Sequence, residues 1–280
     1  MDTGEYLKRF TLDNKFRLDK ESLEIYERAV KQLTEYCGIS LDKITKRDIR
    51  QWLGHLSDKG YKPWTICSKL TGLKTFFNYC KEEEYILTNP AEKVPFPTVE
   101  EKQLSYLTMN KLVQLKEIVS GRSLVERAVV EVLYSTGMRI GEMTALKRDD
   151  LNWSERMIHI QKGKRKKGRV VLFTRDCEAH LKEYMESCPA NSPYVFASPL
   201  LVDRPIHPDS VGKWFRKYSE ELGFKVTPHT LRHTFAAHLV RKGMPIDYIQ
   251  ILLGHEEPQQ TRYYARLYSQ ASKEIFDEFM

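Results

Sequence analysis

Side chains able to act on a phosphate group lie at four places in the second half of the chain, each where a predicted helix or strand begins or ends. Arg139 follows a predicted helix end between two glycines, so it can project from a turn rather than from a helix face. His229 and Arg232 stand three residues apart at a predicted helix start, where side chains share a face and free backbone N–H groups favour anions. His255 follows a glycine that ends another predicted helix, and lysines fill the segment 162–169.

Together these residues point to chemistry at phosphorus. They comprise two arginines, a lysine, two histidines and a tyrosine from the pair Tyr263 and Tyr264, without a carboxylate or thiolate centre or a glycine-rich nucleotide loop. Guanidinium groups can hold non-bridging phosphate oxygens, imidazole and ammonium groups can move protons, and a phenol can attack phosphorus. The set predicts a reaction through pentacoordinate phosphorus with no metal and no cofactor. Each residue also has a structural explanation: Arg139 can pair with Glu142, and the histidines and tyrosines can pack in a core.

The segment 162–169 predicts a basic hairpin. It holds six cations in eight positions with no acid, and it lies between the β-like runs 157–160 and 170–173. Its place between two strands argues against a disordered tail, although a short charge run is often only a solvated turn. Such a loop binds phosphate oxygens without reading bases, so its binding should weaken steeply with salt.

The composition supports binding to a polyanion. The 280 residues carry 45 Lys and Arg against 38 Asp and Glu, a net charge of +7. The first 100 residues contribute 17 cations and 16 acids, or +1, so the rest contribute 28 and 22, or +6. No window approaches the 18 or more apolar residues of a membrane span, the N-terminus has no signal-peptide core, and the five cysteines form no C-x-x-C pair. We therefore expect an intracellular protein with reduced thiols and no membrane partner.

Apolar periodicity predicts a mainly α fold in two domains. Residues 1–93 are predicted to form a four-helix-type bundle. Residues 94–103, with Pro95 and Pro97 and no periodic apolar pattern, form the predicted linker. Residues 104–280 are predicted to be mainly helical with a small antiparallel sheet. The predicted helices span 20–37, 45–60, 64–79, 108–119, 124–134, 176–187, 208–222, 231–242 and 246–253.

These clusters resemble the motifs of the tyrosine recombinases, the phage-integrase-type site-specific recombinases, and especially their compact Xer-like two-domain members. Residues 136–142 are similar to the family's first arginine box, and residues 229–235 resemble its H-x-L-R-H-[ST]-F box. Residues 252–255, Leu-Leu-Gly-His, together with Tyr264 resemble its L-L-G-H and tyrosine box. The boxes occur in the family's order and the resemblance covers nearly the whole chain. It implies an N-terminal core-binding domain that clasps DNA opposite a catalytic domain.

The resemblance also implies a role for each box residue. Arg139 and Arg232 would clamp the scissile phosphate. His229 would accept a proton from, or hydrogen-bond, the attacking phenol or the phosphate, and His255 would hold a non-bridging oxygen and steady the nucleophile. In the family the nucleophile sits nine residues after that histidine, which selects Tyr264 over the tyrosine before it.

The proton donor to the departing 5′ oxygen would be the hairpin lysine of the family's G-K-G pattern. Here Gln161 stands in place of the first glycine, and the hairpin is longer. Lys162 is the predicted donor, with Lys164 and Lys166 as competitors. Three further residues are predicted to be supporting or structural: Glu142, His233 and Asp149.

The implied reaction cuts a DNA strand to leave a 3′-phosphotyrosyl bond and a free 5′-hydroxyl, and a partner strand's hydroxyl then attacks that bond. Bond energy is conserved, so neither ATP nor a divalent metal is needed. Family members act as tetramers on two duplexes through a four-way junction, which implies a homotetramer on double-stranded DNA with an inverted-repeat core site. The tail 269–280 is expected to dock on a neighbouring subunit, with packing in its own subunit as the alternative.

The biological use is less constrained. A length of 280 residues without an extra arm-binding domain favours resolution of dimers or transposon cointegrates over phage- or mobile-element integration. DNA relaxation of the type IB topoisomerase kind is disfavoured by the spacing of His255 and Tyr264, and a non-catalytic DNA-binding protein would have no use for Tyr264. We expect a cytoplasmic, nucleoid-associated enzyme.

Overall fold

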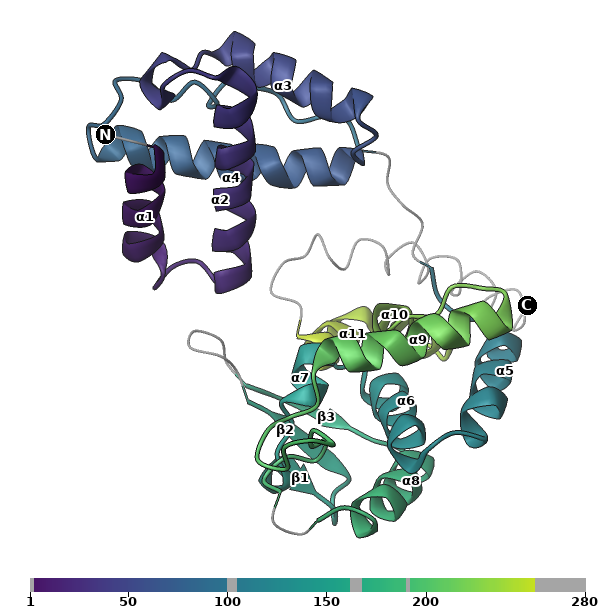
Figure 1. The fold of residues 1–280 in the computed structure, drawn as a ribbon. Coiled ribbons are helices and arrows are strands. Elements are labelled where there is room, and N and C mark those ends of the chain that lie inside the picture. Colours follow the sequence, from purple (N-terminus) through teal and green to yellow (C-terminus); the bar gives the residue numbers. More distant parts are fainter. Residues whose placement is uncertain (1–2, 100–104, 162–167, 190–191, 255–280) are drawn as a thin grey trace. The chain divides into compact units, whose positions relative to one another are not determined.

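The computed structural model describes residues 3–99, 105–161, 168–189 and 192–254 (Figure 1). The chain divides into two compact units, Met1–Lys102 and Gln103–Met280, and each has its own hydrophobic core. The predicted fold class, mainly helical with a small antiparallel sheet, is confirmed. Across the described ranges, no helix is long and apolar enough to cross a membrane.

The first unit is a helical bundle built around Trp52, Phe76 and Phe77, which are almost completely buried. Its described elements are α1 Thr3–Asn14, α2 Lys20–Cys37, the 3-10 turn η1 Leu41–Lys43, α3 Lys46–Asp58 and α4 Pro63–Glu82. A capping box begins α3, because the Asp48 carboxylate accepts the Thr45 backbone N–H at 2.8 Å while the Thr45 side chain accepts the Asp48 N–H. The side chains of Thr45 and Asp48 therefore fix where this helix begins.

The helix α1 was not predicted from the sequence. It buries Leu7 and Phe10, and the Phe10 ring meets the Phe76 ring edge-on with centroids 5.4 Å apart. Only these two apolar side chains of its 12 residues are buried, so the apolar period in this short segment is weak.

Part of the predicted linker lies along the first unit. Val94 is buried, the Cys67 thiol donates to the Pro97 carbonyl at 3.7 Å, and the Lys74 ammonium lies 4.6 Å from the centroid of the Phe96 ring. Residues 94–97 thus pack on α4 as an extended strap.

The second unit surrounds the buried helix α6 with helices and a small sheet. Its described elements are α5 Met109–Ser120, α6 Leu124–Thr136, α7 Ile140–Thr144, η2 Arg148–Asp150, β1 Leu151–Asn152, β2 Met157–Ile160, β3 Arg169–Leu172, α8 Arg175–Glu186, α9 Pro208–Leu222, α10 Pro228–Arg241 and α11 Ile246–Leu253. The strands are antiparallel in the order β1-β2-β3, and Ile160 pairs with Arg169 at the mouth of the hairpin (Figure 1).

Helix α10 begins earlier than predicted. The Thr227 side chain accepts the Thr230 N–H at 3.0 Å and Pro228 takes the first helical position, so cap chemistry sets the start rather than the first apolar residue. The far side of α10 holds the beginning of the unit: Thr234 Oγ1 accepts the Leu107 N–H at 2.9 Å, and His238 Nε2 lies 3.0 Å from the Leu107 carbonyl oxygen. This helix is thus fixed along its length.

Candidate active site

The turn between α6 and α7 is shaped by Gly137. Its φ of +62° lies in the left-handed region, and a Cβ atom at this position would come within 2.3 Å of the Phe235 ring on α10. Only glycine fits both the backbone and the space. The turn therefore packs directly on α10 and delivers Arg139 as the N-cap residue of α7.

We expect Gly137→Ala to lower the free energy of unfolding by about 2–5 kcal/mol, because left-handed strain costs ~1–2 kcal/mol and overpacking adds ~1–3 kcal/mol. Urea unfolding measures the change. Gly141→Ala is the matched control, since Gly141 lies in the next helix with nothing within 4 Å of its virtual Cβ. That control should be neutral or slightly stabilising. Equal losses in the two variants would contradict the steric argument.

Arg232 joins three parts of the site. Its guanidinium is buried and donates from Nη1 to the Gly137 carbonyl at 2.6 Å and from Nη2 to the Leu253 carbonyl at 2.6 Å. One side chain of α10 thereby ties the α6–α7 turn to the end of α11. Both carbonyls are helix-terminal groups that lack a partner within their own helix.

Arg139 lies beside Glu142 at the start of α7. The Arg139 backbone N–H donates to Glu142 Oε2 at 2.7 Å, and Nη1 lies 3.2 Å from Oε1, while the Arg139 side chain remains 40% exposed. Burial alone would raise the pKa of Glu142, but hydrogen bonds from Arg169 and from the Arg139 N–H, with the charges of both arginines, lower it to about 2. Glu142 is therefore ionised at any working pH.

Arg169 has a different position from the one predicted. It was counted among the six cations of the hairpin, but its side chain is only 6% exposed. Nη1 and Nη2 each donate to a Glu142 oxygen at 2.7 Å, and Nε donates to the Leu252 carbonyl at 2.9 Å. Arg169 anchors the second strand of the hairpin to α7 and α11 instead of projecting into solvent.

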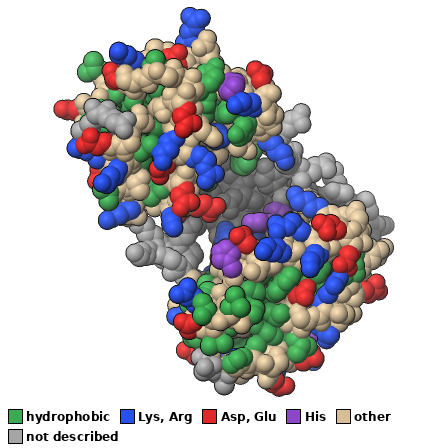
Figure 2. All heavy atoms as spheres, in the orientation of Figure 1, with side chains coloured by type: hydrophobic (Ala, Val, Ile, Leu, Met, Phe, Trp, Pro, Cys, Tyr) green, Lys and Arg blue, Asp and Glu red, His purple; other side chains and the backbone are tan. Residues whose placement is uncertain are grey.

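His229 and His233 lie on α10 beside the arginines. Burial lowers the pKa of His229, and the charges of Arg232 and Arg139 lower it further, which places its ring in the field of both guanidinium groups. Burial, with His229 and Arg232 nearby, lowers the pKa of His233 to about 4. Both rings are neutral near pH 7, so His229 can accept a proton there. On the face of the second unit in Figure 2, histidines gather beside Lys and Arg side chains at the edge where α9–α11 lie.

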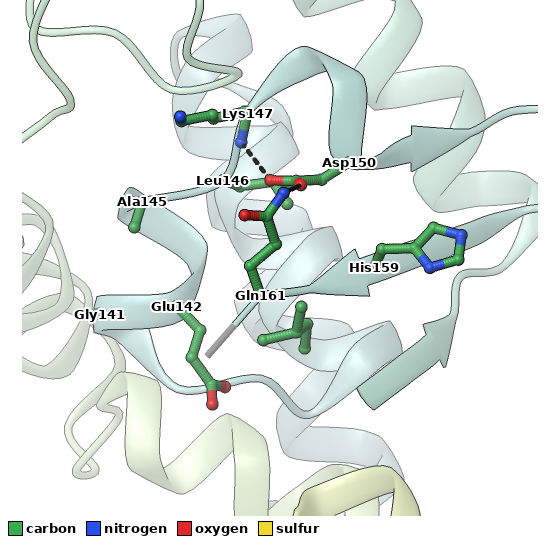
Figure 3. A pocket seen from close by; sticks show the side chains of 9 residues that line it. Gly141, Glu142, Ala145, Leu146, Lys147, Asp150, His159 and Gln161 are labelled. Atoms are coloured by element: carbon green, nitrogen blue, oxygen red, sulfur yellow. Dashed lines mark hydrogen bonds between the residues drawn. The ribbon is translucent and has the colours of Figure 1, made fainter. Parts of the chain in front are cut away.

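The first strand of the hairpin is also anchored at its end. Gln161 Nε2 donates to Asp150 Oδ1 at 2.6 Å, and the Lys147 backbone N–H donates to Oδ2 at 2.9 Å (Figure 3). This contact forms one wall of a cavity of about 350 Å³, and Glu142 stands on the side of α7. The supporting acid is thus Asp150, which is 5% exposed, and not the predicted Asp149, which is exposed.

The described residues bring Arg139, His229 and Arg232 together. Lys162, His255, Tyr264 and the tail 269–280 lie outside the described residues. The chain reaches His255 through Gly254, which ends α11 with a φ of +62°. Within the described ranges, no group of three or more His, Cys, Asp or Glu side chains could hold a metal ion.

The anchors Arg169, Asp150 and Gln161 were missed by sequence analysis. For Asp150 a signal existed, because it stands three residues after Lys147 and caps that backbone N–H. For Arg169 no local signal distinguished it from its cationic neighbours.

Comparisons with known proteins define the class. The Phage integrase family model matches residues 105–271, and the Phage integrase SAM-like domain model matches residues 4–95. The chain therefore belongs to the phage integrase family of tyrosine recombinases, enzymes that exchange DNA strands by transesterification.

Individual relatives align with this chain over most of their length. The chain is 30% identical to the tyrosine recombinase XerC of Chlamydia trachomatis, covering 87% of this chain and 80% of that protein. It is similar to the crystal structure of XerA recombinase, with 27% identity, a TM-score of 0.57 and 98% of each chain covered. The fold is also similar to that of lambda integrase, solved as a tetramer bound to a Holliday junction, with 20% identity, a TM-score of 0.73, and 92% and 78% of the two chains covered.

Proposed function

We propose that this protein is a site-specific recombinase in which Tyr264 cuts DNA to form a 3′-phosphotyrosyl intermediate. The observation that carries the proposal is the position of Arg232. Its guanidinium donates hydrogen bonds to the carbonyls of Gly137 and Leu253. It therefore joins the turn that precedes Arg139 to the end of the helix that precedes His255. Neutral His229 lies in the field of both arginines and supplies a proton acceptor.

In the proposed reaction the Tyr264 oxygen forms a bond to phosphorus, and the bond from phosphorus to the 5′ oxygen breaks. The phenol proton passes to His229 or to a phosphate oxygen, and the leaving 5′ oxygen takes a proton from Lys162. A 5′-hydroxyl from the partner duplex then gives its proton to Lys162 and bonds to phosphorus, the bond from phosphorus to Tyr264 breaks, and the phenol recovers the proton held by His229 or the phosphate oxygen. Arg139, Arg232 and His255 stabilise the charge on the non-bridging oxygens in both steps.

We further propose that four subunits act on two duplexes with inverted-repeat core sites, as the lambda integrase tetramer on a Holliday junction suggests. The tail 269–280 docks on a neighbouring subunit in this assembly. Residues 1–93 form the core-binding domain, 94–103 the linker and 104–280 the catalytic domain. Resolution of dimers or cointegrates, in the cytoplasm and at the nucleoid, is the proposed use.

The test first sequences the DNA next to the gene for a pair of short inverted arms and then builds a nicked suicide duplex that carries this sequence. The short fragment leaves after cleavage, so religation stops. We expect the protein to become covalently attached to a DNA 3′ end in the presence of EDTA. Attachment to a 5′ end, or a requirement for a divalent metal, would exclude the proposed chemistry. Relaxation of a supercoiled plasmid without the site would point instead to a topoisomerase.

The role of Lys162 has its own test. Lys162→Ala should slow cleavage of a natural phosphodiester by about 100-fold or more, because general-acid catalysis contributes 10²–10⁴-fold. A 5′-phosphorothiolate leaving group needs little protonation and should restore the rate of this variant. The same substrate should not rescue Arg139→Ala, which loses charge stabilisation. If it rescues Lys164→Ala or Lys166→Ala instead, that lysine is the donor.

A further inference from the structure

The Glu142 carboxylate is shared unequally between two arginines. Arg169 makes two parallel contacts of 2.7 Å with it, one to each oxygen, whereas the Arg139 side chain makes one contact of 3.2 Å. Parallel guanidinium–carboxylate bonds are the stronger and more directional arrangement. The Glu142 carboxylate therefore pairs mainly with the buried Arg169, and its interaction with the exposed Arg139 side chain is weaker.

If Arg169 were removed, Arg139 would be the remaining arginine of this cluster with which the Glu142 carboxylate could pair. Arg139 and Glu142 stand three residues apart at a helix start, a spacing that brings opposite charges together. The three charges of Arg139, Glu142 and Arg169 sum to +1, and the pair alone would sum to zero. Because a neutralised guanidinium attracts an anion much less, Glu142 would then compete with a phosphate for Arg139.

The position of Arg169 does not depend on Glu142 alone. Its Nε atom donates to the Leu252 carbonyl at 2.9 Å, and a Cβ atom on Gly254 would lie 2.9 Å from Arg169 Cδ. The Leu252 carbonyl and the space that a side chain at position 254 would fill thus hold the Arg169 side chain in place. Arg169 can hold Glu142 in place because it is itself held.

We propose that Arg169 is a positioning residue that sequesters the Glu142 carboxylate and thereby keeps the Arg139 guanidinium available for the scissile phosphate. This inference rests on the proposed function, in which Arg139 binds that phosphate. The inference predicts that removing Arg169 slows cleavage because Glu142 then pairs with Arg139. It also predicts that the loss of rate depends on the negative charge of the scissile phosphate.

The experiment measures single-turnover adduct formation on the suicide duplex with Arg169→Met, Arg169→Lys, and the double variant Arg169→Met with Glu142→Gln. Arg169→Met should cleave about 100-fold more slowly than the unaltered protein, a loss typical of one electrostatic contact to a transition state. The double variant should regain about tenfold or more, because a neutral amide competes weakly with phosphate. Arg169→Lys offers one point charge in place of two parallel donors and should show an intermediate loss.

A methylphosphonate at the scissile position separates positioning from general damage. Its phosphorus centre is neutral, so the charge on Arg139 matters less, and the deficit of Arg169→Met should shrink to within about tenfold. Arg122→Met is the matched control: it also removes an arginine from a carboxylate pair, here with Glu221 between α9 and the end of α5. That variant should cleave both substrates at the unaltered rate.

The possible outcomes separate the positioning role of Arg169 from the proposed function. Equal deficits of Arg169→Met on phosphate and methylphosphonate, or a double variant no faster than the single one, would overturn the inference while the unaltered protein still forms its adduct. Should Arg169→Met not fold, as judged by thermal unfolding, the same comparison applies to Arg169→Lys. Failure of the unaltered protein to form any adduct would overturn the proposed function, and this inference with it.

Discussion

The Tyr264→Phe variant is expected to form no covalent adduct with the suicide duplex, because the substitution deletes the oxygen that would bond to phosphorus. No other change of a single atom should have so large an effect, since the remaining groups bind or move protons but do not enter the intermediate. DNA binding should persist, because cations rather than the phenol supply most of the affinity. Denaturing electrophoresis of labelled DNA measures the adduct directly.

The control for this experiment is the adjacent tyrosine. The spacing of nine residues after His255 selects Tyr264, and not its neighbour, as the nucleophile. Tyr263→Phe should therefore retain the adduct. Persistence of the adduct in Tyr264→Phe, with its loss in Tyr263→Phe, would move the nucleophile by one residue.

Arg232→Ala should reduce cleavage by about 1000-fold and also destabilise the fold. One lost electrostatic contact to a transition state typically costs 10²–10³-fold in rate. The substitution also leaves the Gly137 and Leu253 carbonyls, which Arg232 binds at 2.6 Å each, without this donor. Each unsatisfied buried carbonyl costs about 1–3 kcal/mol, so the free energy of unfolding should fall by roughly 2–6 kcal/mol.

Single-turnover cleavage and urea unfolding measure the two effects separately. Arg148→Ala is the matched control, because Arg148 also donates to a carbonyl, that of Pro189 at 3.1 Å, but is itself only partly buried. It should lose little stability and no cleavage. A rate for Arg232→Ala within tenfold of the unaltered protein, measured where the variant is folded, would contradict the proposed phosphate clamp.

Local signals predicted most helices, because periodic apolar residues and caps are local properties of the chain. The capping box of Thr45 and Asp48 marks the start of α3 within one residue. Apolar periodicity predicts the start of α10 three residues late, because the cap at Thr227 sets the start before the first apolar residue. The short helix α1 buries too few apolar side chains to reveal itself.

The anchoring of the site could not be predicted in the same way. Arg169 binds Glu142, 27 residues before it, and Leu252, 83 residues after it, so nothing in its own neighbourhood distinguishes it from the lysines beside it. The proximity of Arg139, His229 and Arg232 was suggested by motif resemblance rather than by local physics. Only the tertiary fold shows that Arg232 reaches carbonyls 95 residues before it and 21 after it.

The two anchored ends of the basic hairpin have a consequence for how such an enzyme can change over evolution. Gln161 is bonded to Asp150 and Arg169 to Glu142, so the two ends are held by contacts that do not involve the residues between them. Substitutions in that segment that spare the proposed proton donor therefore leave the contacts to Asp150 and Glu142 in place. A lineage could therefore vary this one segment while inheriting the arginine framework unaltered.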